Sequence, residues 1–280
     1  MVNIIKSDLY RMRKGKSIYI VLIMMMIFSF ASIYGMSPGR IGVTTSNQEM
    51  DLQKYDEETL EKIKNANSLN DMRAIMKENG NYDLDKEIIG TNVNLYYIFI
   101  VIVFIGICAD FSNSSIKNTL TSAISRKKYY FSKLLFCLGV GTTIIFFNTY
   151  FIYFLNLVLN GTNFSSSIWE VTKLTLFQLP LLYGIISLLV GISFLTKKAA
   201  VFNSVSIPFI MVVQLILFGI ISLFKINAPW ILDYEVQFAL SNLATNPTTM
   251  YILKCTLLGG IYSVLFNAIG YFSFKKAEIK

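Results

Sequence analysis

The sequence predicts an all-α, polytopic membrane protein, and both the composition and the clustering of apolar residues support this fold class. Of the 280 residues, 54% are hydrophobic and only 15% are charged, whereas an average soluble domain has about 25% charged residues. The apolar residues gather in six stretches without Asp or Glu. Each is long enough to cross a bilayer, which takes about 20 helical residues. These observations exclude a soluble enzyme, a disulfide-rich secreted domain and a disordered chain.

Polar or basic segments separate the six predicted transmembrane helices. We expect the spans at residues 17–36, 93–109, 134–159, 174–196, 199–224 and 250–274. The parts outside the membrane are then a leader, an acidic insert, a basic segment, a half-apolar stretch with two prolines and a short tail. They cover residues 1–16, 37–92, 110–133, 225–249 and 275–280, while a short polar loop at 160–173 and a tight turn at Lys197 and Lys198 join the remaining spans.

The leader MVNIIKSDLYRMRKGK is amphipathic. Its apolar residues recur at spacings of three and four, and most of its basic residues lie elsewhere on the helical wheel. This pattern is typical of a helix lying in the membrane interface. The apolar run that follows is longer than the core of a signal peptide and lacks an A-x-A-like site, so we expect a retained span. The residues assigned to the interfacial helix are Ile5, Lys6, Leu9, Arg11 and Met12.

The insert at 37–92 is rich in acidic residues, with eleven Asp and Glu against seven Lys and Arg. Leu52, Tyr55, Leu60 and Ile63 fit one helix face, and Ser68 fits the N-cap of a second helix. We therefore expect a small helical hairpin outside the membrane. Its negative charge allows two interpretations, namely a solvated cap that stabilises a dimer or a surface that captures cationic peptides.

The charges also predict the orientation. Placing both termini, the segment 110–133 and the turn at Lys197 and Lys198 on one side collects 15 of the 25 Lys and Arg residues there. The positive-inside rule makes that side the cytoplasm. The net charge of +8 is therefore a topology signal, and we expect no nucleic-acid partner.

Several absences limit the chemistry. The chain has no His, no G-x-x-x-x-G-K-[ST] loop for ATP phosphates and no carboxylate within the predicted spans. We therefore expect no catalytic residue, no metal and no cofactor in this chain. Asp110, at the cytoplasmic end of a span, reads as a solvated cap in preference to a proton relay. The cysteines Cys108, Cys137 and Cys255 read as packed thiols.

The segment 110–133, DFSNSSIKNTLTSAISRKKYYFSK, predicts a short amphipathic helix between two spans. A serine can cap it, its apolar residues share one face, and Ser125 can cap the helix that follows. Two interpretations stay open, a basic loop that only sets topology or a coupling helix that docks on a cytosolic partner. The candidate coupling residues are Ser114, Ile116, Lys117, Asn118, Leu120, Ile124, Arg126, Lys127 and Lys128.

Six spans with both ends inside, the basic leader and the run IKNTLTSAISRKKYYFSK resemble the permease subunits of type-two ABC exporters. The resemblance implies an interfacial helix beside the ATPase, a coupling helix at 114–128 and re-entrant helices in 225–249. It also implies a second permease, ATPase partners that hold ATP and Mg²⁺, and an amphipathic peptide substrate. Within the family, the chain looks most like Gram-positive permeases for peptide toxins, bacteriocin immunity or bacitracin-like resistance. A membrane immunity or sensor protein that transports nothing is the alternative.

Polar and small residues within the spans have two possible uses. Polar groups can line a substrate pathway or bond neighbouring helices. The candidate pathway residues are Asn148, Gln178, Asn203, Gln214 and Asn267. Glycines are expected to allow close helix approach at Gly139, Gly141, Gly184, Gly191, Gly259 and Gly260. Pro180 and Pro208 are expected to kink their helices.

Overall fold

The computed structural model describes residues 1–36, 84–91, 94–113, 115–121, 124–162, 165–223, 234–245 and 247–277, with single positions between 58 and 75. Within these ranges the chain is helical and has no strand. The elements are α1 (Val2–Lys14), α2 (Lys16–Met36), α5 (Leu84–Thr91), α6 (Asn94–Val103), η2 (Phe104–Cys108), α7 (Ala109–Ser112), α8 (Ser115–Thr121), α9 (Arg126–Asn160), α10 (Ile168–Thr196), α11 (Ala199–Leu223), α12 (Val236–Thr245) and α13 (Thr249–Lys276).

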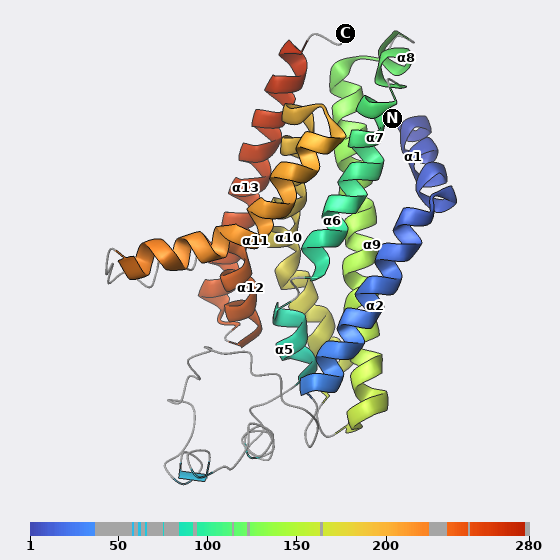
Figure 1. The fold of residues 1–280 in the computed structure, drawn as a ribbon. Coiled ribbons are helices and arrows are strands. Elements are labelled where there is room, and N and C mark those ends of the chain that lie inside the picture. The colour runs from blue at the N-terminus through green and yellow to red at the C-terminus, as the bar shows by residue number, and fades with distance from the viewer. Residues whose placement is uncertain are drawn as a thin grey trace.

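Five helices in the described ranges are long and apolar enough to cross a membrane: Lys16–Gly35, Leu95–Ser112, Arg126–Asn160, Ile168–Thr196 and Thr249–Lys276. They form an elongated bundle (Figure 1). Large apolar side chains remain exposed on the outer helices, for example Ile23 at 56% and Val264 at 72%. Such surfaces suit contact with lipid, and the all-helical membrane architecture agrees with the sequence prediction.

The predicted span 199–224 is the one that these five do not include. It forms the helix α11. Within α11, the continuous apolar part with described side chains is Ala199–Ile210, which is shorter than the five candidate spans. Pro208 lies inside α11, and Figure 1 shows the second half of the helix running sideways, away from the bundle. A proline lacks the N–H of a helix interior and favours such a bend. A sixth span stays a prediction.

Two short helices close the end of the bundle opposite the termini (Figure 1). The helix α5 falls within the predicted insert, yet it packs into the bundle with Leu84 and Ile89 fully buried. Its Asp85 accepts hydrogen bonds from the backbone N–H and hydroxyl of Ser166, at 3.0 and 2.8 Å. In the predicted re-entrant stretch, α12 packs on α5. Most of the predicted hairpin lies outside the described residues.

The closest helix pair, α10 and α13, is joined through glycines. A Cβ added to Gly259 would stand 2.3 Å from the carbonyl carbon and oxygen of Pro180, and one at Gly191 would stand 2.9 Å from the Phe266 carbonyl oxygen. Neither position has room for a side chain. The prediction of close approach is confirmed there and at Gly141 and Gly184. It is wrong for Gly139 and Gly260, where nothing lies within 4 Å.

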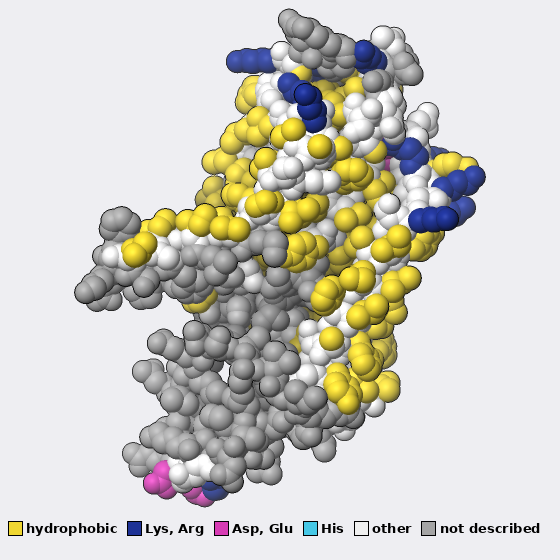
Figure 2. Space-filling model, in the orientation of Figure 1, with side chains coloured by type: hydrophobic (Ala, Val, Ile, Leu, Met, Phe, Trp, Pro, Cys, Tyr) yellow, Lys and Arg dark blue, Asp and Glu magenta, His cyan; other side chains and the backbone are white. Residues whose placement is uncertain are grey.

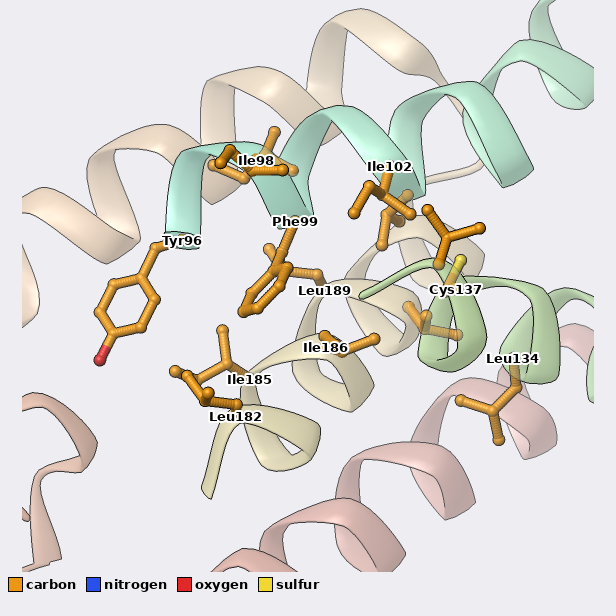
Figure 3. Packing of buried hydrophobic residues seen from close by; sticks show 14 of the residues in the cluster. Tyr96, Ile98, Phe99, Ile102, Leu134, Cys137, Leu182, Ile185, Ile186 and Leu189 are labelled. Carbon is orange, nitrogen blue, oxygen red and sulfur yellow. The ribbon is translucent and has the colours of Figure 1, made fainter. Parts of the chain in front are cut away.

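The core lies among α6, α9 and α10. Figure 3 shows Phe99 of α6 pointing toward Ile185 and Leu189 of α10, with Ile102 beside Cys137 of α9. All five side chains are at most 7% exposed. This packing fixes the three helices against one another and supports α1, α7 and α8 at one end of the bundle.

Both termini lie at the same end of the bundle (Figure 1). Figure 2 shows Lys and Arg side chains gathered at that end, over α1 and above the bundle. This grouping is the spatial counterpart of the charge asymmetry in the sequence, and we refer to it as the basic end.

Candidate functional site

The predicted coupling segment folds at the basic end as α8 and the first turns of α9. An open hollow of about 520 Å³ lies at their junction, lined by Lys117, Leu120, Thr121, Ile124, Ser125 and Arg126. Four of these six residues are candidate coupling residues. The structure therefore brings most of the described candidates to one concave surface.

The apolar face of α8 turns inward. Ile116 is 2% exposed and belongs to the main hydrophobic core, and Leu120 and Ile124 pack against that core half-buried. The predicted face exists, but the protein's own bundle covers it. Lys117 and Thr121 are exposed on the other side of the helix. Ser114 and the side chain of Asn118 lie outside the described residues.

The start of α9 is fixed from two directions. The Ser125 hydroxyl accepts a hydrogen bond from the Lys128 N–H at 3.3 Å, which confirms the predicted cap. Arg126 donates to the carbonyl oxygens of Phe274 and Lys275, at 3.2 and 2.6 Å. It thereby satisfies free carbonyls at the C-terminal end of α13. Arg126 is a brace between α9 and α13, while Lys127 and Lys128 are exposed.

Where α1, α7 and α9 meet, four charged side chains contact one another, three of them buried and Arg11 half-buried. Lys133 of α9 bonds both Asp8 oxygens of α1 at 2.8 Å and Asp110 at 2.6 Å. Arg11 of α1 bonds Asp110 at 2.5 Å and also bonds Asp8. We call Asp8, Arg11, Asp110 and Lys133 the charge quartet. Lys133, Asp8 and Asp110 are 1%, 2% and 4% exposed, and two positive charges balance two negative ones, as buried charges require.

Asp110 is the centre of this network. The Tyr129 hydroxyl donates to its Oδ2 at 2.7 Å, and the Ser115 hydroxyl donates to its Oδ1 at 3.1 Å. Ser115 is the first residue of α8, so Asp110 joins α1, α7, α8 and α9. The expectation of a solvated cap is wrong, because four side chains enclose the carboxylate and its pairing with two cations stabilises its charge.

The interfacial-helix residues divide between two environments. Ile5 and Met12 pack half-buried against the core, whereas Lys6 and Leu9 are exposed. Arg11 enters the charge quartet. Burial alone would lower the pKa of Arg11, but hydrogen bonds and charge attraction from Asp110 and Asp8 outweigh it and raise that pKa. The guanidinium therefore stays charged and keeps α1 attached to the bundle.

The candidate pathway residues lie mainly in contacts between helices. Asn148 accepts a hydrogen bond from Ser29 of α2 at 3.2 Å, and Gln178 donates to the Ile89 carbonyl of α5 at 3.4 Å. Asn267 accepts one from Tyr130 of α9 at 2.9 Å. All three thus have a use in helix packing. Asn203 is half-buried on α11, and the side chain of Gln214 lies outside the described residues.

The three cysteines are free and buried, as predicted for packed thiols. Among the residues that the structure describes, no group of His, Cys, Asp and Glu could hold a metal ion.

The chain matches no known family model, and no curated protein or solved structure is significantly similar to it. Its class rests on the fold itself, an all-helical chain with several helices of membrane-spanning length and composition.

Proposed function

We propose that the chain is the transmembrane permease subunit of an ATP-driven ABC exporter, multi-pass in the cell membrane of a Gram-positive bacterium. It would move membrane-active peptides or peptide antibiotics out of the cell or membrane. Separate ATPase subunits would bind ATP and Mg²⁺, and a second permease, identical or related, would complete the transporter. The observation that supports this proposal best is the hollow at the junction of α8 and α9.

The hollow has the properties that a coupling surface needs. Its exposed rim carries Lys117, and Lys127 and Lys128 are exposed in the adjoining first turn of α9. This positive rim would attract an acidic surface on a partner. Ile116 packs α8 against the core, and Arg126, which lines the hollow, bonds the C-terminal end of α13. A push on the rim would therefore pass directly to long helices of the bundle.

A change of charge on the rim tests the docking step. We expect Lys117→Glu to lower recruitment of the ATPase at least tenfold, because the rim would lose most of its positive charge and would place a carboxylate against the acidic partner. Lys276→Glu is the matched control, since it reverses an equally exposed charge at the same end of the bundle but outside the hollow. Recruitment is measured as ATP hydrolysis that co-purifies with the full-length protein.

Equal ATPase recruitment by the Lys117→Glu variant and by wild type would contradict docking of the ATPase on this rim. Failure of the wild-type protein to recruit any ATPase, combined with intact peptide resistance, would favour the immunity or sensor alternative.

We propose that the basic end faces the cytoplasm, because Lys and Arg are enriched on the cytoplasmic side of membrane proteins, and this orientation has a separate test. Thr121→Cys on α8 and Thr249→Cys at the start of α13 are both exposed and lie at opposite ends of the bundle. We expect an impermeant thiol reagent to label Cys at position 249 from outside intact cells and at position 121 only after the membrane is opened. Labelling of both from outside would contradict the topology. Native thiols do not interfere, because they are buried.

A further inference from the structure

The helix that leads into the coupling segment contains an irregular turn. Between α6 and α7, residues Phe104–Cys108 form the π-helical turn η2, and the N–H of Ala109 donates to the carbonyl of Phe104, five residues earlier. The α-helical pattern resumes when the N–H of Asn113 donates to the Ala109 carbonyl at 3.0 Å. Such a turn holds one residue more than an α-helical turn. π-helical turns are rare in proteins, and those that occur often lie at functional sites.

The turn is tightly enclosed. Gly106, Ile107 and Cys108 are buried. A Cβ added to Gly106 would stand 2.7 Å from the Phe136 ring of α9, so η2 touches α9 through the one residue without a side chain. The extra residue is therefore held by contacts on several sides and is not a frayed end.

The register that η2 creates places Asp110 in the charge quartet. An α-helix turns about 100° per residue. If the extra residue were absorbed into regular α-helix, Ala109 and all that follows would rotate by about that angle relative to α6. Asp110 would then leave Lys133 and Arg11. Because Ser115 is bonded to Asp110, α8 would move with it.

We propose that η2 is a rotary joint between the transmembrane helix α6 and the coupling segment α7–α8, and that the charge quartet is the latch that holds its register. Opening the latch lets η2 relax toward α-helix and turns α8 relative to α6. Force on α8 would reach the membrane part of the protein through this rotation. The source of that force rests on the proposed function, but the joint and the latch are properties of this chain alone.

Spin labels can measure the rotation in the full-length protein in lipid nanodiscs. Exposed sites at Thr121 of α8 and Lys276 of α13 carry the labels. Wild type is expected to give one main distance. Asp110→Asn removes the ion pairs while it keeps a hydrogen-bonding side chain, and we expect a second population. A rotation of about 100° would displace a side chain on a helix about 10 Å wide by roughly 8 Å.

Two further variants separate the joint from general loosening. Glu170→Gln, the control, breaks an exposed ion pair with Lys86 at the other end and should keep the wild-type distance. Deleting Ile105 removes the extra residue of η2, so the turn should become regular α-helix while α6 and α7 keep their positions. No extra residue then remains whose absorption could rotate α7 and α8. The deletion combined with Asp110→Asn should therefore restore the single distance. An unchanged distance in Asp110→Asn, or a second population that survives the deletion, would overturn the joint.

The deletion also tests the role in transport. With Ile105 deleted, ATPase recruitment should equal that of wild type, while ATP-driven peptide export should fall at least tenfold. Full export by this variant would show that η2 is not used in coupling. If wild type recruits no ATPase, the proposed function fails, and the distance measurements still decide whether η2 and the charge quartet form a latched joint.

Discussion

Replacing Lys133 with Met should destabilise the protein by about 3–5 kcal/mol, the usual cost of leaving a buried charge without its partner. Lys133 is 1% exposed and bonds both Asp8 and Asp110. Without it, two buried carboxylates face a single guanidinium. Equilibrium unfolding in mixed micelles measures the loss.

Two comparisons show whether this cost comes from the charge. Adding Asp8→Asn to Lys133→Met leaves the balanced pair Arg11 and Asp110, so much of the lost stability should return. Lys86→Met, which breaks an ion pair with the half-exposed Glu170, should cost only about 0–1 kcal/mol. Equal costs for Lys133→Met and Lys86→Met would contradict the burial of the charge quartet.

Adding a single methyl group at Gly259 is the second change with a large expected effect. Its Cβ would stand 2.3 Å from backbone atoms of Pro180, and backbone cannot move aside as the end of a flexible side chain can. We expect Gly259→Ala to cost about 1–3 kcal/mol, as overpacking does in well-packed cores.

The neighbouring glycine provides the control. Nothing lies within 4 Å of a Cβ at Gly260, and alanine stabilises a helix interior by about 1 kcal/mol relative to glycine. Gly260→Ala should therefore be neutral or stabilising. The same unfolding measurement reads both variants, and a matching loss in the two would argue against the close contact of α10 with α13.

Local features of the fold were predictable from the sequence because short-range rules determine them. Apolar runs indicated the spans, and the serine before a basic turn indicated where α9 begins. The kink of α11 follows from Pro208, whose effect is also local. Small residues on α10 and α13 indicated close approach, although spacing alone could not separate Gly259 from Gly260.

The charge quartet was not predictable in this way. Arg11 and Asp110 are 99 residues apart in the chain, and Asp8 and Lys133 are 125 apart. No local pattern joins them, and only the spacing of three between Asp8 and Arg11 gave a signal. Similarly, periodicity indicated that Ile116 lies on an apolar face, but it could not show that the bundle covers that face. Apart from Gly106, no residue in the sequence indicated the π-helical turn η2 or the change of helical register that it causes.

The most direct test of an ATP-driven permease is cross-linking from the rim of the hollow. A photo-reactive residue at Thr121 in the full-length protein, activated in native membranes, should form an adduct with a chain that carries a G-x-x-x-x-G-K-[ST] loop. The same residue at Thr249, exposed at the opposite end, should form none. Absence of such an adduct at Thr121, or equal adducts at both positions, would contradict the proposed function.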